Sequence, residues 1–248
     1  MNSCTKLRGC VMTRPFSTPH VAPLYKALPY QYLGVRKISA YCRCDPDALR
    51  AFLPDEFELL GDVCEVFQLE APDAGPLGHY SESGVVIPMT FDGTPGAHVA
   101  LEYVSSDDSL AAGREIWGYP KKMAEVPFRS LENGGFESST IRRGTTIISM
   151  KFTPGGDAFE KPVMQPRFQI KTFATADGTG WDLYQVIRND LANVEVRDHQ
   201  FGTVELELKG SDDDPLDRLG VESVIGAEST LIDFLLQGGR ILKSLDAA

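Results

Sequence analysis

Two adjacent lysines, Lys121 and Lys122, have the clearest potential for covalent chemistry in this sequence. They follow a segment that is predicted to be the end of a helix, closed by Gly118. A lysine amine can attack a carbonyl carbon and form a Schiff base, but only after it has lost its proton. Because the ordinary lysine pKa is about 10.4, lowering it to about 7 requires destabilising the ammonium by roughly 4–5 kcal/mol.

Burial in an apolar pocket and a neighbouring cation would both lower the pKa of such a lysine. Trp117 and Tyr119 are local sources of apolar surface, and Lys122 is a local cation beside Lys121. A lysine pair is also common after the end of a helix, where solvated cations interact favourably with the helix dipole. The pair by itself therefore leaves both interpretations open.

The elements around this pair are predicted to be mainly strands. Three turn dipeptides, which begin at Asp92, Asn133 and Asp177, separate several segments rich in β-branched and aromatic residues. No alternation of strands with helices and no repeat is present, so we expect an α+β fold that is mainly antiparallel β. We expect one domain over residues 1–248, with an irregular segment over 1–25. The predicted strands are residues 35–43, 63–69, 85–91, 98–104, 146–152, 168–174 and 204–208.

Three helices are predicted among these strands. Asp45, followed by proline, indicates an N-capped helix that ends near Pro54. Ser109 is predicted to cap a helix over residues 110–117. Apolar residues recur at helical spacing over residues 229–245, which predicts a third helix despite a glycine pair in its middle.

Composition excludes several classes of partner. The net charge of −11 argues against binding to nucleic acid, which needs clustered lysine and arginine. No apolar run approaches the roughly 18–20 residues that span a bilayer, and residues 1–14 lack the apolar core of a signal peptide. Five irregularly spaced cysteines indicate reduced thiols in a cytoplasmic protein. Cys42 and Cys44 have no second cysteine pair to complete a zinc site, so we expect no metal.

The lysine pair belongs to a longer motif, GREIWGYPKK, at residues 113–122. Upstream lie DPDALR at 45–50, YSESG at 80–84 and IPMTFDG at 87–93. These blocks and their spacing resemble the acetoacetate decarboxylase family, and the resemblance extends over most of the chain. It implies a mainly β fold with a central β-barrel and a few packed helices, assembled into a homo-oligomer.

The resemblance also implies the roles of individual residues. Lys121 would be the Schiff-base lysine, Lys122 the adjacent cation that lowers its pKa, and Glu82 a pocket glutamate close to the reacting imine. Tyr119 would line the site. The expected substrate is a small keto acid, most simply a β-keto acid whose decarboxylation uses the protonated imine as an electron sink. No metal and no organic cofactor is required.

Two positions depart from the family pattern. The family places a carboxylate-binding arginine where this chain has Val35, with Arg36 next to it. It places a second pocket glutamate where this chain has Phe67, flanked by Glu65 and Gln68. Arg36, Gln68 and Phe67 are therefore further candidates for substrate contact. Since neighbouring strand residues point to opposite faces, Arg36 replaces the missing arginine only if the strand shifts or bulges.

These departures leave three functions open. The chain decarboxylates a larger or differently anchored keto acid, or it uses the same Lys121 imine for aldol condensation and dehydration, as some decarboxylase-like relatives do. The third is a non-catalytic barrel that binds a small ligand, in which Lys121 would lack amine reactivity.

Overall fold

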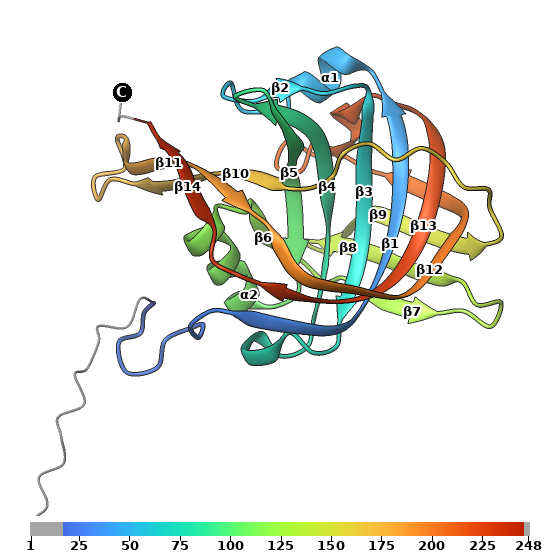
Figure 1. Cartoon of the computed structure of the whole chain (residues 1–248), viewed down its shortest axis with the longest axis horizontal. Helices are drawn as coiled ribbons and strands as arrows, with labels where there is room; N and C mark the ends of the chain where they lie inside the picture. Colours follow the sequence, from blue (N-terminus) through green and yellow to red (C-terminus); the bar gives the residue numbers. More distant parts are fainter. Residues whose placement is uncertain (1–16, 246–248) are drawn as a thin grey trace, which may run out of the picture.

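The computed structural model describes residues 17–245, in which fourteen strands form one large, strongly curved sheet with short helices packed against it (Figure 1). Within these residues the path of neighbouring strands runs from β14 to β7 without closing into a barrel, and β2 and β6 pair with it from the side. The pairs of β5 with β10 and with β6 are parallel, and the other strand pairs are antiparallel. The predicted α+β class, dominated by antiparallel strands, is confirmed, but the sheet of the described residues does not close into the expected central β-barrel.

All seven segments predicted as strands lie within observed strands. The helical segments are α1 (Pro46–Arg50), η1 (Gly75–Leu77), α2 (Asp107–Ala112), η2 (Gly113–Trp117) and η3 (Leu216–Leu219). The strands are β1 (Tyr30–Cys44), β2 (Glu58–Leu59), β3 (Val63–Ala71), β4 (Tyr80–Phe91), β5 (Thr94–Val104), β6 (Lys121–Met123), β7 (Phe128–Ser130), β8 (Phe136–Arg142), β9 (Thr145–Pro154), β10 (Arg167–Ala174), β11 (Trp181–Asn189), β12 (Leu191–Leu208), β13 (Val221–Leu236) and β14 (Arg240–Ser244).

The predicted turns connect successive antiparallel strands. Asp92 (φ 48°) and Gly93 (φ 71°) both have positive φ between β4 and β5, the geometry that an Asp-Gly hairpin turn requires. Gly134 (φ 77°) and Gly178 (φ 71°) have the same left-handed backbone between β7 and β8 and between β10 and β11. Glycine tolerates this backbone because it has no Cβ. Turn chemistry therefore identified these hairpins from sequence.

The first predicted helix is confirmed as α1, although it ends at Arg50 and not near Pro54. The Asp45 carboxylate accepts a hydrogen bond from the Asp47 backbone nitrogen at 2.8 Å, which satisfies one of the free donors at the helix start. No helix among residues 17–245 is long and apolar enough to cross a membrane.

The second predicted helix begins three residues earlier than expected. Ser106, not Ser109, is the N-cap of α2, and its hydroxyl accepts a hydrogen bond from the Ser109 backbone nitrogen at 3.4 Å. Ser109 is thereby buried inside the first turn. The helix continues into the π-helical turn η2 and ends at Gly118, which has φ 84° as expected for a helix-terminating glycine.

The third predicted helix, over residues 229–245, is wrong, because this segment forms the end of β13 and all of β14. β13 pairs with β1 on one side and with β12 on the other, so its backbone hydrogen bonds are satisfied by neighbours. Both of its faces carry apolar residues, and such a pattern fits helical spacing as well as strand alternation. Long-range pairing therefore decided its conformation.

The central strands are buried on both faces. In β1, Ile38, Ala40 and Cys42 belong to the main apolar core, while Val35 and Lys37 line a cavity on the other face. The same alternation continues through β3 and β4 next to it. The sheet thus has one face that supplies the core and one that supplies a candidate site.

Gly118 is predicted to be essential for joining η2 to the strand that carries Lys121. A Cβ at Gly118 would lie 2.5 Å from the Ile170 carbonyl oxygen, whereas one at Gly93 would have no neighbour within 4 Å. Both glycines have positive φ, which costs a non-glycine residue about 1–2 kcal/mol. We expect Gly93→Ala to lower the free energy of unfolding by about that amount, and Gly118→Ala by roughly 1–3 kcal/mol more because of the overlap.

Urea denaturation followed by circular dichroism measures this difference, with Gly93→Ala as the matched control for backbone strain. Equal unfolding midpoints for the two variants would contradict the predicted overlap.

Candidate active site

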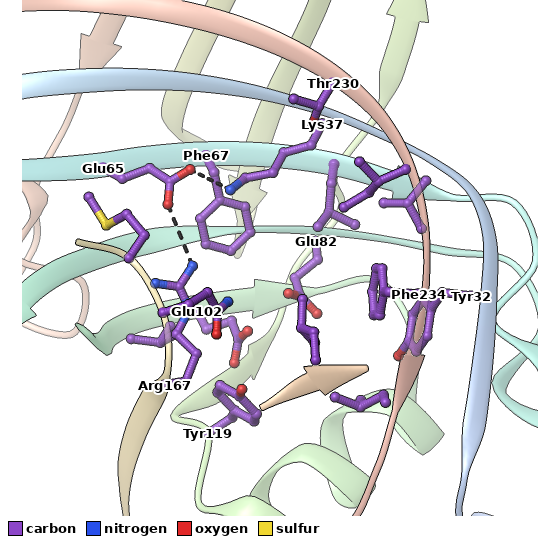
Figure 2. A pocket seen from close by; sticks show the side chains of 18 of the residues that line it. Tyr32, Lys37, Glu65, Phe67, Glu82, Glu102, Tyr119, Arg167, Thr230 and Phe234 are labelled. Carbon is purple, nitrogen blue, oxygen red and sulfur yellow. Dashed lines mark hydrogen bonds and ion pairs between the residues drawn. The ribbon is translucent and has the colours of Figure 1, made fainter. Parts of the chain in front are cut away.

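A cavity of about 300 Å³ lies on the face of the sheet opposite the main core (Figure 2). Its walls come from β1, β3, β4, β5 and β13, from Tyr119 and Lys121 after η2, and from the start of β10. Apolar and aromatic side chains form most of the walls, with a small number of charged groups among them. This size and composition are typical of a site for a small molecule.

Lys121 is held inside this cavity by contacts along its whole length. Its Nζ donates to Glu82 Oε2 at 2.7 Å and to Ser109 Oγ at 3.0 Å, and the side chain is only 8% exposed. Pairing of β6 with β5 places Lys121 beside Glu102. Its aliphatic stem lies against Gly113, where a Cβ would come within 2.5 Å of the lysine Cδ. The structure therefore brings Lys121 and Glu82 together, as the sequence predicted.

A pair of carboxyl groups surrounds the Lys121 amine. Glu102 is 3% exposed, and burial followed by the adjacent Glu82 charge raises its pKa well above the usual range. Burial therefore favours the protonated form of Glu102, whereas Glu82 forms an ion pair with Lys121. The pair of carboxyls can hold and exchange protons next to the amine.

The expectation of a lowered pKa for Lys121 is wrong. Burial lowers the pKa of this amine, but attraction to the carboxyl groups of the site, above all to the Glu82 carboxylate, outweighs burial and raises the pKa above the ordinary value. The motif alone could not reveal this, because both carboxylates come from other strands. The amine must therefore transfer its proton within the site before it can act as a nucleophile.

Two tyrosines cover the amine. Lys121 Nζ lies 5.5 Å from the centre of the Tyr80 ring and 5.9 Å from that of Tyr119. Burial raises the pKa of both phenols, so both stay neutral. The Tyr119 hydroxyl accepts a hydrogen bond from Asn189 Nδ2 at 3.0 Å, which fixes the ring in the wall. Ring faces at this distance stabilise a cation, whether ammonium or iminium.

Lys122 lies outside the cavity. It follows Lys121 in β6 and therefore points to the other face of the strand. Its Nζ donates to the Asp213 carbonyl oxygen and forms an ion pair with the Asp214 carboxylate at 2.9 Å. Its charge is thus neutralised locally, and a role for Lys122 in setting the pKa of Lys121 stays a prediction.

Arg36 and Gln68 also point away from the cavity. Arg36 forms an ion pair with Asp198 at 2.9 Å, and Gln68 Nε2 donates to Thr140 Oγ1 at 3.1 Å. β1 has three register shifts relative to β13, one before Val35 and two after Tyr41, and none of them turns the Arg36 side chain into the cavity. The structure therefore corrects the expectation that these two residues contact a substrate in the pocket.

Val35 and Phe67 do line the cavity, together with charged residues that the sequence analysis did not select. Lys37 follows Val35 by two positions in β1, and Glu65 precedes Phe67 by two positions in β3. Strand alternation was a sufficient signal for both, since residues two apart share a face.

Two further charged residues of the cavity, Glu102 and Arg167, had no local signal in the sequence. Their positions depend on which strands pair. Among residues 17–245, no group of three or more histidine, cysteine, aspartate or glutamate residues is arranged to hold a metal ion.

Sequence comparison places this arrangement among known proteins. A family model described as Acetoacetate decarboxylase (ADC) matches residues 13–245. Acetoacetate decarboxylase 2 of Mesorhizobium japonicum is 28% identical to this chain over 236 residues, which cover 94% of this chain and 90% of the relative.

Solved structures show the same fold. Acetoacetate decarboxylase from Legionella pneumophila has a TM-score of 0.85 with 26% identity, covering 98% of this chain and 99% of that one. The enduracididine biosynthesis enzyme MppR, in complex with the condensation product of pyruvate and imidazole 4-carboxaldehyde, has a TM-score of 0.80 with 18% identity. That likeness covers 95% of this chain and 99% of the MppR chain, and at this identity it shows the fold alone.

The two carboxyls are predicted to set the protonation of Lys121. In the double variant Glu82→Gln/Glu102→Gln, burial remains while the attraction to the ammonium is lost, so the pKa of Lys121 should fall below about 10.4. In the unchanged protein it should lie above that value. Modification of Lys121 by a small amine-selective reagent, quantified by peptide mass spectrometry across pH, measures both midpoints.

N-acetyl-lysine amide serves as the reference amine under the same conditions. If the midpoint of the double variant stayed above that of the reference, burial would be too weak to matter, and the electrostatic account of this site would be wrong.

Proposed function

This chain belongs to the acetoacetate decarboxylase family, and on that premise we propose that it is a carbon–carbon lyase that decarboxylates a small keto acid through an imine on Lys121. The observation that carries the proposal is a buried amine, 8% exposed, with the Glu82 carboxylate 2.7 Å from its nitrogen. An amine that served only to bind a ligand would not need a second, protonated carboxyl beside it. Glu102 supplies that group.

Imine formation begins with transfer of one proton from the Lys121 ammonium to Glu82. In a desolvated pocket, a neutral amine beside a neutral acid competes with an ion pair, because burial penalises both charges. The free amine then attacks the substrate carbonyl carbon, and Glu82 returns its proton as the oxygen leaves as water. The product is a protonated imine next to the Glu82 carboxylate.

Carbon dioxide is lost in the next step. The bond between the carboxylate carbon and its neighbour breaks, and its electron pair flows into the iminium to give a neutral enamine. Glu102 donates its proton to the enamine carbon, and water hydrolyses the resulting imine to a ketone and the Lys121 ammonium. Glu102 regains a proton from solvent, which accounts for the one proton that decarboxylation consumes.

The apolar side chains at Val35 and Phe67 favour the loss of carbon dioxide. A carboxylate in such surroundings loses hydration, whereas carbon dioxide is uncharged, so charge disappears from an apolar region as the bond breaks. An arginine at position 35 would hold the carboxylate more firmly in the ground state.

A second candidate is an aldolase-dehydratase that uses the same Lys121 imine. Val35 and Phe67, where the family pattern has charged groups, are the observation that favours it, because neither apolar side chain can hold a leaving carboxylate in place. MppR, whose structure holds a condensation product of pyruvate, has the same fold. The two functions differ in their products. A decarboxylase releases carbon dioxide from a β-keto acid, whereas an aldolase-dehydratase condenses pyruvate with an aldehyde.

Borohydride trapping tests the imine directly. We expect incubation with acetoacetate, and separately with pyruvate, followed by borohydride, to attach the ketone carbon skeleton to Lys121 through a stable secondary amine. Peptide mass spectrometry locates the adduct. Lys121→Ala should abolish it, whereas Lys151→Ala, which removes a half-exposed lysine outside the cavity, should leave it unchanged.

An adduct spread over surface lysines, with Lys121 unmodified, would refute the proposed mechanism and favour a non-catalytic ligand-binding protein. If Lys121→Ala retained the turnover of a confirmed substrate, the imine would likewise be excluded.

A further inference from the structure

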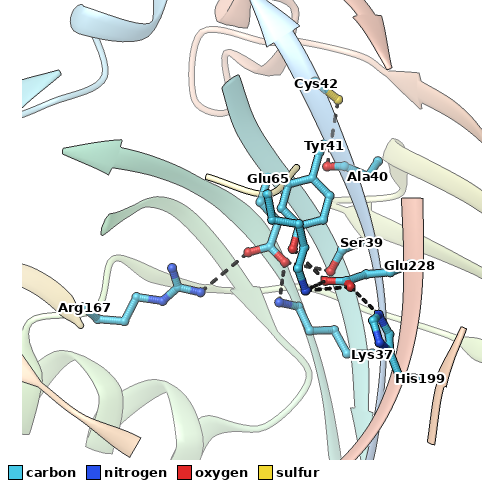
Figure 3. A network of polar contacts seen from close by, with 10 residues as sticks. Lys37, Ser39, Ala40, Tyr41, Cys42, Glu65, Arg167, His199 and Glu228 are labelled. Atoms are coloured by element: carbon cyan, nitrogen blue, oxygen red, sulfur yellow. Dashed lines mark hydrogen bonds and ion pairs between the residues drawn. The ribbon is translucent and has the colours of Figure 1, made fainter. Parts of the chain in front are cut away.

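A second group of charges lies in the same cavity, along the strands from Lys121. The Glu65 carboxylate, 1% exposed, forms ion pairs with Lys37 and with Arg167 NH2, the latter at 3.6 Å (Figures 2 and 3). Ser39 Oγ donates to the same carboxylate at 2.7 Å. Although burial raises the pKa of Glu65, the charges of Lys37 and Arg167 lower it to about 2. Glu65 is therefore ionised at neutral pH.

This group has one positive charge more than it has negative charges. Lys37 and Arg167 contribute two cations, and Glu65 contributes one anion. Glu228 also lines the cavity, but its carboxylate is occupied by Lys161 at 2.9 Å, as well as by other donors of the network in Figure 3. The end of the cavity that holds Lys37 and Arg167 is thus locally positive in a protein of net charge −11.

One donor in this group lacks an acceptor. The Arg167 side chain is only 12% exposed, and its NH1 atom is buried. NH1 has no hydrogen-bond partner among the described residues. A buried, unsatisfied donor on a charged group is costly, and a bound anion would satisfy it. The guanidinium also acts electrostatically on Glu102 and Tyr119, which places it between the two charged groups of the cavity.

The two charged groups are separated by an apolar wall. Glu65 in β3 pairs with Val86 in β4, four residues from Glu82, so the backbones that carry the two carboxylates lie roughly 13 Å apart along the strand. Lys37 pairs with Leu69 and is therefore level with Glu82, and its long side chain extends along the cavity to Glu65. The apolar lining of the cavity includes Val35, Phe67, Leu69, Val99 and Met164. A matching ligand has a carbonyl at one end, a short aliphatic linker and an anion at the other.

We propose that Lys37 and Arg167 bind a second, non-reacting carboxylate of the substrate, and that the substrates are 3-oxo dicarboxylic acids. This inference rests on the proposed function, because it assigns the reacting carbonyl to Lys121. The carboxylate β to the carbonyl lies in the apolar region and leaves as carbon dioxide. The distal carboxylate accepts hydrogen bonds from Arg167 NH1 and Lys37 Nζ and stays on the product.

The chain offers variants that change this charge without stripping Glu65 of every cation. Lys37→Met leaves Arg167 as its partner, and Arg167→Met leaves Lys37, so each removes the excess positive charge while one ion pair is kept. Glu65→Gln changes the charge in the opposite direction. If these residues have only a structural role, all three variants should lose activity. If they bind an anion, the preference for an anionic substrate should fall in Lys37→Met and Arg167→Met and rise in Glu65→Gln.

The experiment compares 3-oxoadipate, 3-oxopimelate and 3-oxosuberate with the monoacids of equal chain length, and measures carbon dioxide release. At the best length, we expect kcat/KM for the diacid to exceed that for its matched monoacid by about tenfold or more, the effect of one charge-assisted hydrogen bond. Lys37→Met and Arg167→Met should each remove most of this preference and change monoacid turnover only a few-fold. Glu65→Gln should increase the preference.

Two outcomes overturn the inference. One is equal kcat/KM for diacids and monoacids at every length. The other is an equal fall in kcat/KM for diacids and for monoacids in the Lys37→Met and Arg167→Met variants. Turnover of monoacids without any preference would refute this inference alone and leave the Lys121 mechanism intact.

If no acid were turned over and no borohydride adduct formed on Lys121, the proposed function would fail. Calorimetric titration with adipate and hexanoate, which cannot form an imine, would then decide the inference by itself. Tighter binding of adipate that is lost in Lys37→Met and Arg167→Met supports the distal anion site, and equal binding of the two acids overturns it.

Discussion

Burying an ammonium ion is the constraint on which the arrangement of this protein depends. Moving such a charge out of water costs several kcal/mol even after the protein relaxes, unless a partner charge compensates. Lys121 meets this constraint through the Glu82 carboxylate, hydrogen bonding to Ser109 and two flanking tyrosine rings. Burial, together with the adjacent Glu82 charge, raises the pKa of the second carboxyl group, Glu102, and favours its neutral form.

The backbone around Lys121 follows from the same constraint. For the amine to reach Glu82, β6 must run parallel to β5, and the chain must turn sharply after η2. Gly118 makes the turn with φ 84°, and Gly113 leaves room for the lysine stem. The π-helical turn changes the direction in which the chain leaves the helix; such turns are frequent at functional sites. Local geometry and site chemistry are therefore inseparable here.

Much of the fold could be predicted from local patterns. Strands with β-branched residues, Asp-Gly hairpins and the Asp45 cap are determined by residues close in sequence, and all of these predictions were confirmed. The segment 229–245 was not predictable in this way, because it is apolar on both faces and its conformation depends on pairing with β1 and β12. Its error has a physical origin: burial on both sides removes the period that distinguishes a strand from a helix.

The residues of the site also differ in whether local sequence or long-range strand pairing determines their position. Lys121 and Glu82 lie in two separate short motifs, each of which could be found in the sequence, whereas Glu102 and Arg167 enter the cavity only through the strand pairing around β5. The pKa of Lys121 shows the consequence: local residues suggested a lowered value, and distant carboxylates reverse the direction.

Alternation explains how polarity in the pocket is redistributed. Val35 and Phe67 are apolar where the family pattern has charged groups, but Lys37 and Glu65 lie two positions away on the same faces of the same strands. A step of two residues moves a side chain roughly 6–7 Å along the sheet without turning it away from the cavity. From Phe67 to Glu65 the step leads away from the row of Glu102 and Lys121, whereas Lys37 is level with Glu82 and extends its side chain to Glu65. A substrate that contacts both Lys121 and this second charged group must be longer than a β-keto acid with a single carboxylate.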